Sequence, residues 1–166
     1  MWQGPQRFSM DMTEENLDRP HIIGSREIVD FPDWNVGGIE AKIDTGARTS
    51  AIHVEDVSRL KGGRVRFHLV ISRRRPFKHV PVSAELVRLS RVRTSTGHTQ
   101  ERYVVSTTVR LGTVRRRIEL SLVGRDKMLC RMLLGRSALE GFLIDPHRRY
   151  VFGRPKSKSV RRKEPA

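Results

Sequence analysis

Apolar and polar residues alternate along several stretches of the chain, and this alternation restricts the fold more than any other feature. The clearest run covers residues 64–71, and similar runs cover residues 39–43, 105–111 and 118–122. A period of two residues places successive side chains on opposite faces of a β-strand. Several short strands of this kind, separated by turns, predict an all-β sandwich or barrel.

Turn and helix signals are consistent with that class. Gly62-Gly63 and residues 111–113 lie between strand-like runs and are typical of turns. The segment Arg136–Glu140 lies between two glycines and predicts one short C-terminal helix. Acidic residues early in the segment Val54–Leu60 favour a second helical turn there.

The chain has 166 residues, which suits one domain. Residues 1–20 are polar and without period, and they are expected to form a flexible lead. Residues 21–153 are expected to form the domain, and residues 154–166 a flexible basic tail. A lone cysteine, Cys130, forms no internal disulfide. The chain has no apolar run of membrane-spanning length and no secretory signal, so we expect no membrane association and a cytoplasmic location.

The net charge of +15 resides mainly in the domain, where residues 21–153 carry 25 basic and 13 acidic side chains. Such a field concentrates anionic partners near the surface. Nucleic acid and acidic peptides both fit this description, and so does a solvated surface that serves solubility alone.

The run Asp44-Thr45-Gly46-Ala47 follows a predicted strand directly. A carboxylate at the point where a strand turns at a glycine lies at the rim of a sheet, where a substrate can reach it. Gly46 permits a tight loop and a close approach of the backbone to a ligand. The hydroxyl of Thr45 is able to hydrogen-bond within the loop. We therefore take Asp44, Thr45 and Gly46 as candidate catalytic residues.

A second motif, Met132-Leu133-Leu134-Gly135-Arg136, follows Asp44 after about 90 residues. Two large apolar residues, a glycine and a polar residue that opens a helix form the other half of a retropepsin signature. Between the two motifs lies a polar, glycine-containing turn, Thr94–Gln100, at the place of a flap hairpin.

These residues carry a resemblance to a bacterial and archaeal family named as ATP-dependent zinc proteases, which has a retropepsin-like fold. The match is carried by residues 41–53, 95–97, 102–105, 132–136 and 142–146. The resemblance implies a single-domain acid-protease barrel. It also implies that Leu133, Leu134, Gly135 and Arg136 support the catalytic loop, and that the flap and loop residues contact substrate, namely Ala47, Arg48, Ser95, Thr96, Gly97 and His98.

The implied activity is that of an aspartic peptidase that acts as a homodimer. A single chain supplies one Asp44, whereas aspartic proteolysis requires two neighbouring carboxylates, one ionised and one protonated. Two like charges a few ångströms apart cannot both be ionised. A two-fold dimer supplies the carboxylate twice, and Thr45 from each chain is placed to join the two loops.

Arg48 occupies a position that is usually acidic in viral retropepsins. An arginine there favours an acidic substrate, and a glutamate-rich peptide tail is our preferred hypothesis, because some members of the family resemble partners of ATP-grasp glutamate ligases. An internal salt bridge of Arg48 is the simpler alternative. Arg136 loses the acidic partner that viral relatives provide, and Glu55, Asp56 and Asp126 are the candidates to replace it.

Other chemistries find little support in the sequence. The six histidines form no His-Glu-x-x-His motif, and His53 is expected to be a packed residue near the site. Gly135-Arg136-Ser137-Ala138-Leu139 lacks the final glycine of a serine-hydrolase elbow. A phosphate-binding Gly-Lys-Ser/Thr loop is absent. We therefore expect no metal and no other cofactor, so any use of ATP would come from a partner.

The alternative function is a non-catalytic basic module on the same fold that binds RNA or the ribosome weakly. The clusters Arg73–Arg75 and Arg115–Arg117, together with the tail, favour it, because basic clusters make most phosphate contacts. An aromatic content of 6% argues against it, because single-stranded nucleic acid is usually bound by stacking on aromatic rings.

Overall fold

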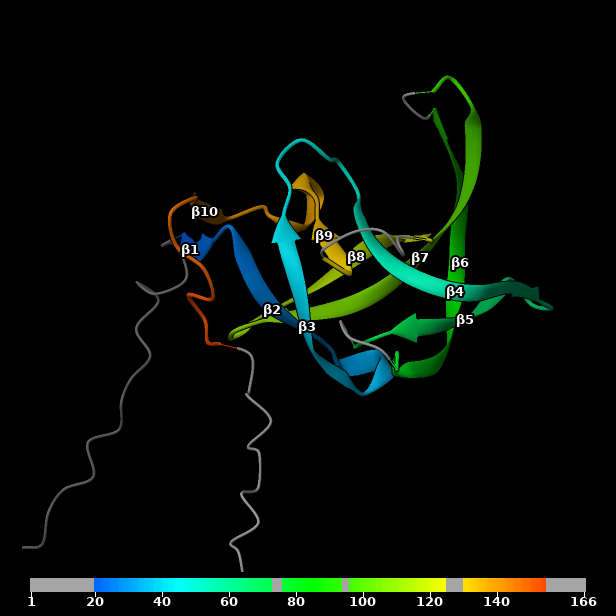
Figure 1. The fold of residues 1–166 in the computed structure, drawn as a ribbon, viewed down its shortest axis with the longest axis horizontal. Coiled ribbons are helices and arrows are strands. Elements are labelled where there is room, and N and C mark those ends of the chain that lie inside the picture. Colours follow the sequence, from blue (N-terminus) through cyan, green and yellow to red (C-terminus); the bar gives the residue numbers. More distant parts are fainter. Residues whose placement is uncertain (1–19, 73–75, 94–95, 125–129, 155–166) are drawn as a thin grey trace, which may run out of the picture.

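The structure, a computed structural model, describes residues 20–72, 76–93, 96–124 and 130–154. Almost all of its regular structure is β-strand, which confirms the predicted all-β class (Figure 1). The elements in chain order are β1 His21–Gly24, β2 Arg26–Phe31, η2 Pro32–Trp34, β3 Val36–Ile43, β4 Ser50–Leu60, β5 Arg64–Val70, β6 His79–Arg93, β7 Thr99–Leu111, β8 Val114–Val123, β9 Met132–Leu134, η3 Arg136–Ala138 and β10 Phe142–Asp145.

The ends of the chain fall largely outside this description. The expected lead over residues 1–20 and the expected tail over residues 154–166 lie outside the described residues, except for Pro20 and Arg154. Within the described ranges, no helix has the length and hydropathy that a membrane span requires.

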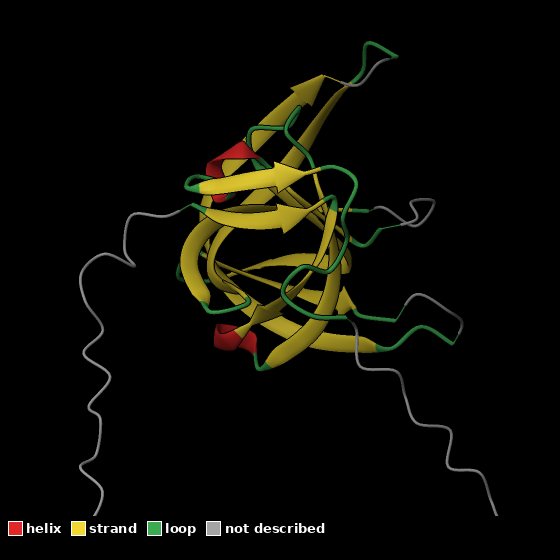
Figure 2. Ribbon diagram, turned by 90° about the vertical axis from the view of Figure 1, so that its left-hand side faces the viewer, coloured by secondary structure: helices red, strands yellow, loops and turns green. Residues whose placement is uncertain are grey.

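One curved sheet forms the body of the domain. The strand order is β2-β3-β9-β4-β5-β6-β7-β8, and the further pairings β2–β7 and β4–β8 bring distant strands of this order together. The sheet therefore curls around its own apolar face as a barrel, with η2 and η3 at opposite ends (Figure 2). The parallel pair β1–β10 forms a separate two-stranded sheet.

The alternating residues fill the barrel as predicted. In β5, Val65, Phe67 and Leu69 are fully buried, while Arg64 and Arg66 are exposed. At the η2 end, Trp34 stacks on Phe31 with ring centroids 4.7 Å apart, and its edge meets Phe67 at 5.6 Å. Burial of this apolar surface makes the main favourable contribution to the folding free energy of the domain.

One local prediction was wrong, and another is met by a shorter element than expected. The segment expected to form a helical turn, Val54–Leu60, continues strand β4 and pairs with β5. A bulge between Glu55 and Ser58 places Asp56 at a φ of 53°, so the acidic residues belong to a kinked strand. The expected C-terminal helix is only the three-residue 3-10 turn η3, which begins after Gly135 without a side-chain cap.

A buried carboxylate fixes the end of the described chain against the barrel. Glu27 is fully buried. Its Oε1 accepts hydrogen bonds from the backbone N–H groups of Gly24 at 2.7 Å and Val151 at 3.0 Å, and its Oε2 accepts one from Phe152 at 3.4 Å. This single side chain therefore joins β2 to the segment after β10.

We expect Glu27→Ala to lower the free energy of unfolding by at least about 2 kcal/mol, because each buried N–H left without an acceptor costs about 1–3 kcal/mol. Glu27→Gln retains the Oε1 acceptor and should cost less. Urea denaturation of both variants and the wild type measures the difference. Equal stability of Glu27→Ala and the wild type would contradict the role of the carboxylate.

Candidate active site

Asp44 lies immediately after β3, where the strand ends and the chain turns. Its backbone N–H donates to the carbonyl of Leu134 at 2.9 Å, which continues the pairing of β3 with β9. Its carboxylate Oδ1 accepts hydrogen bonds from the N–H groups of Gly46 at 3.0 Å and Ala47 at 3.2 Å. The side chain is half-buried, whereas Thr45 and Gly46 are exposed. The loop thus holds one carboxylate oxygen and presents the group at the surface.

The second motif and the residue after it hold this loop through hydrogen bonds to its backbone. The N–H of Arg136 donates to the carbonyl of Ala47 at 2.8 Å. Ser137 donates to the carbonyl of Arg48 twice, from its N–H at 3.1 Å and from its hydroxyl at 2.8 Å. The hydroxyl of Ser50 accepts the N–H of Gly135 at 3.1 Å. The structure therefore brings together the two halves that the sequence separates by about 90 residues.

The apolar pair of the second motif lies on the strand that pairs with β3, the strand before Asp44. Leu133 and Leu134 are buried in β9, which is paired with β3 on one side and β4 on the other. Leu134 belongs to the main core and is paired in register with Ile43, the residue before Asp44. The backbone of the Asp44 loop consequently rests on the barrel core.

Arg136 binds the loop in a way that the sequence did not indicate. Its Nη1 donates to the backbone carbonyls of Thr45 at 3.0 Å and Gly46 at 3.3 Å. Two of the expected carboxylate partners bind histidines instead. Glu55 lies 2.8 Å from His79, and Asp56 lies 3.0 Å from His68.

The third expected partner of Arg136, Asp126, lies outside the described residues. Backbone carbonyls therefore take the place of the acidic side chain that viral relatives use. Ser50 and Ser137 are further loop-holding residues that sequence reasoning missed. Position is the only sequence feature that marks them. Ser50 begins the strand after the loop, and Ser137 follows the second motif.

The predicted substrate-binding residues lie on two segments. Arg48 is exposed four residues after Asp44, and Ala47 is half-buried within the loop. Thr96, Gly97 and His98 are exposed at the tip of the β6–β7 hairpin, where Gly97 has a φ of 84°.

Ser95 lies outside the described residues. The hairpin and the catalytic loop project from the same end of the barrel (Figure 1). Their substrate contacts remain predictions.

Histidine, cysteine and carboxylate side chains are the groups that would hold a metal ion. In the described part of the chain, no group of three or more His, Cys, Asp and Glu side chains is arranged to hold a metal ion. His53 is 2% exposed and lies 3.6 Å from Glu55, so it is the packed residue that was expected. These residues do not fit a zinc site.

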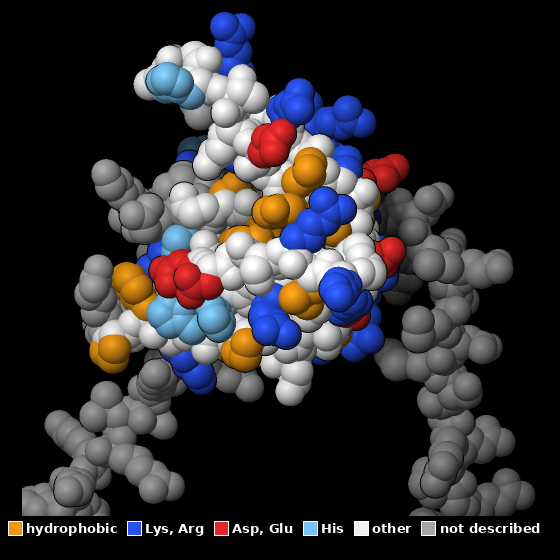
Figure 3. Space-filling model, turned by 90° about the vertical axis from the view of Figure 1, so that its right-hand side faces the viewer, with side chains coloured by type: hydrophobic (Ala, Val, Ile, Leu, Met, Phe, Trp, Pro, Cys, Tyr) orange, Lys and Arg blue, Asp and Glu red, His pale blue; other side chains and the backbone are white. Residues whose placement is uncertain are grey.

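The basic clusters are less continuous than the sequence suggests. Arg115 and Arg117 are exposed, but Arg116 donates to the carbonyl of Ala138 at 3.1 Å and lies over the Phe142 ring. Arg73–Arg75 lie outside the described residues. On the face that Figure 3 shows, Lys and Arg side chains are dispersed among apolar, acidic and histidine side chains.

Proteins similar to this chain include relatives named as ligases and a solved structure of unknown function. Proteins named probable alpha-L-glutamate ligase from Shewanella pealeana and Desulfotalea psychrophila are 33% and 31% identical over 82% and 84% of this chain. The chain spans only 31% of the length of these relatives. A crystal structure of a Legionella pneumophila protein of unknown function has a TM-score of 0.65 and 26% identity, and covers 80% of this chain and 98% of that protein.

None of these comparisons carries the zinc-protease name of the expected family, whereas the retropepsin-like part of that expectation is confirmed. A family model described as retropepsin-like aspartic endopeptidase RimB matches residues 22–155, which is nearly the whole described domain and includes the loop of Asp44. The chain belongs to the RimB-like family of retropepsin-like aspartic endopeptidases.

Proposed function

We propose that the protein is an aspartic peptidase whose active unit is a two-fold dimer, with Asp44 of each copy in the catalytic pair. The observation that carries the proposal is the hydrogen-bonded Asp44 loop. Its carboxylate Oδ1 accepts two backbone N–H groups, and Arg136 donates to two of its carbonyls. A loop held at both its side chain and its backbone keeps a reacting group in one position.

The chemistry requires one ionised and one protonated carboxylate around a water molecule. The ionised Asp44 accepts a proton from the water as its oxygen attacks the peptide carbonyl carbon. The protonated Asp44 of the other copy donates its proton to the carbonyl oxygen. The first Asp44 then gives the proton that it took from water to the peptide nitrogen, while the second Asp44 takes a proton back from a hydroxyl of the tetrahedral intermediate. The C–N bond breaks, the amine leaves, and the pair returns to its starting state. Because each chain has one such loop, the pair forms only between two copies.

The proposed substrate is an acidic, glutamate-rich peptide tail. Three observations support this class: the net charge of +15, the exposed Arg48 four residues after Asp44, and the glutamate-ligase name of the relatives. A peptidase that removes glutamates would oppose a ligase that adds them. We propose an ATP-grasp glutamate ligase as a partner, because the relatives carry the name of such a ligase.

The substrate class is tested with two synthetic peptides that share one sequence and differ only in a C-terminal run of glutamates or glutamines. We expect the purified protein to shorten the glutamate tail at least about tenfold faster, as mass spectrometry of timed samples would show. Adding a chelator should leave the rate unchanged. Equal cleavage of both tails would contradict the acidic-substrate proposal, and loss of activity with chelator would contradict the aspartic mechanism.

Charge reversal at Arg48 tests its role in substrate choice. Arg48→Glu should reduce the preference for the glutamate tail over the glutamine tail by about fivefold, since an exposed ion pair contributes up to about 1 kcal/mol. The ratio of the two kcat/KM values is the measurement. Arg66→Glu makes the same change of charge at an exposed position on β5. An equal effect of the two substitutions would assign the preference to the overall field and not to Arg48.

A further inference from the structure

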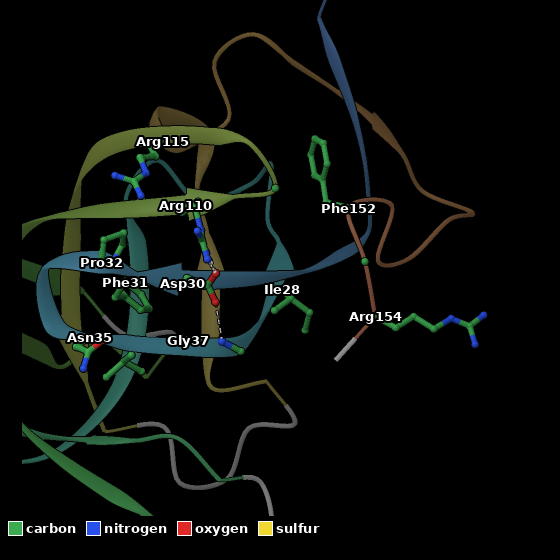
Figure 4. Close-up of a pocket in the computed structure, with 14 residues that line it drawn as sticks. Ile28, Asp30, Phe31, Pro32, Asn35, Gly37, Arg110, Arg115, Phe152 and Arg154 are labelled. Atoms are coloured by element: carbon green, nitrogen blue, oxygen red, sulfur yellow. Dashed lines mark hydrogen bonds and ion pairs between the residues drawn. The ribbon is translucent and has the colours of Figure 1, made fainter. Parts of the chain in front are cut away.

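A cavity of about 910 Å³ lies at the η2 end of the barrel. It is formed by β2, by the turn between β2 and β3, by the β7–β8 turn and by residues 152–154 (Figure 4). We call it the β2–β7 cavity. Its volume is in the range of known ligand sites.

The β2–β7 cavity is separate from the catalytic loop. Gly37 and Gly38 line it near the beginning of β3, whereas Asp44 follows the last residue of the same strand. Six residues of extended strand span about 20 Å. Figure 2 shows the same separation, because η2 and η3 lie at opposite ends of the barrel and η3 adjoins the catalytic loop. Whatever binds in the cavity does not occupy the Asp44 site.

The lining of the cavity is basic. Among the described residues that line it are Arg110, Arg115 and Arg154 but only one acidic residue, Asp30. The carboxylate of Asp30 is already engaged, because Oδ2 accepts from Arg110 and Oδ1 accepts the N–H of Gly38 at 2.8 Å. Arg115 and Arg154 are exposed and form no ion pair within the described part of the chain. Two positive charges therefore remain available to an anionic ligand.

The wall of the cavity is fixed in place by the fold. Phe152 packs directly against Gly112 of the β7–β8 turn, where a Cβ atom would overlap its ring and where φ is +60°. The buried Glu27 accepts the N–H of Phe152. The ring of His21 lies 6.1 Å from that of Phe152. A wall held by these three contacts costs little further ordering when a ligand binds.

We propose that the β2–β7 cavity binds an acidic peptide segment of a partner protein. Carboxylate side chains would pair with Arg115 and Arg154, which lie on different sides of the cavity. Between them, Ile28 is half-buried and offers apolar contact to the rest of the peptide. The lining thus combines charged groups with a smaller apolar contact, as many peptide and protein interfaces do.

A peptide fits the cavity better than a nucleic acid does. Single-stranded nucleic acids gain much of their affinity from bases that stack on aromatic rings. Phe152 is the aromatic side chain at the open edge of the cavity. Its ring already packs against Gly112 and lies near the ring of His21. Phe31, the other ring of the lining, is fully buried in the core.

The binding test uses the full chain and a fluorescein-labelled peptide of alternating glutamate and leucine, measured by fluorescence anisotropy at physiological salt. We expect Arg115→Glu/Arg154→Glu to raise its Kd at least about tenfold, which corresponds to the loss of two charge contacts and the gain of two repulsions. Arg59→Glu/Arg66→Glu changes the net charge equally on the exposed surface of β4 and β5. The control should change Kd less than about twofold.

Each other outcome overturns the proposal. Equal weakening by the two double variants would show a general electrostatic field and no site. The absence of peptide binding to the parent Asp44→Asn protein would exclude the ligand class. Tighter binding of a single-stranded RNA that is lost in Arg115→Glu/Arg154→Glu alone would assign the cavity to nucleic acid. All of these binding measurements are made in the Asp44→Asn background, which does not hydrolyse the peptide, so a failure of binding is distinct from a failure of the proposed peptidase.

Discussion

Asp44→Asn is expected to reduce peptide hydrolysis by roughly 10²–10⁴-fold or more, which is the usual contribution of a general acid–base group. An amide accepts no proton from the attacking water and cannot share one with the second carboxylate. The substitution should leave the fold intact, because Oδ1 of asparagine still accepts the N–H groups of Gly46 and Ala47. Initial rates on the glutamate-tailed peptide, at equal concentration of folded protein, measure the loss.

Asp145→Asn provides a matched control on the same chain. Asp145 is also half-buried, and its Oδ1 also accepts a backbone N–H two residues later, that of His147 at 3.0 Å. It lies in β10, away from the Asp44 loop. This variant should retain activity within about twofold of the wild type. Residual activity of Asp44→Asn at the level of this control would exclude Asp44 from the chemistry.

Gly135→Ala is expected to have the second-largest effect, on stability and activity together. A Cβ atom at Gly135 would lie 2.8 Å from the carbonyl oxygen of Arg48 and from the carbonyl carbon of Thr49. Backbone atoms cannot move away without shifting the loop that carries Asp44. Overpacking of this kind typically costs about 1–3 kcal/mol. Urea denaturation gives the loss of stability, and peptide hydrolysis gives the displacement of the carboxylate.

Gly124→Ala is the control for this substitution. Gly124 is exposed, and no atom lies within 4 Å of the place where its Cβ would be. The unfolding free energy of the Gly124→Ala variant should stay within about 0.5 kcal/mol of that of the wild type, as is usual for substitutions at surface sites. Similar stability of Gly135→Ala and Gly124→Ala would show that position 135 tolerates a side chain. The close packing of the second motif against the loop would then not fix the loop.

Strands that have one buried face could be predicted from the sequence, and strands with mixed exposure could not. In β5 the alternation holds from Arg64 to Leu69, where every second residue is buried, and ends at Val70, which is also buried. In β6 the far half forms the hairpin arm, where Val87 and Leu89 are both exposed, so no period reveals the strand. Residues 54–60 were predicted to form a helical turn because acidic residues lie early in the segment, and the bulge there interrupts the alternation that would have indicated a strand.

The candidate site was predictable as far as its motifs, and its hydrogen bonds were not. The chain order of Asp44 and the second motif indicated that the two segments meet, and they do. The acceptors of Arg136 are backbone carbonyls, and every residue has one, so the sequence gives no signal for them. The structural carboxylate Glu27 was missed for a related reason, since all three of its donors are backbone N–H groups.

The claim that the catalytic pair comes from two copies is tested most directly by subunit mixing. The wild type and Asp44→Asn are mixed at a constant total concentration, allowed to exchange, and assayed for hydrolysis of the glutamate-tailed peptide. If both carboxylates are required, activity follows the square of the wild-type fraction, so an equal mixture retains about a quarter of the activity, as random pairing in a two-fold dimer requires. Activity that falls linearly, to about half in the equal mixture, would contradict the shared pair.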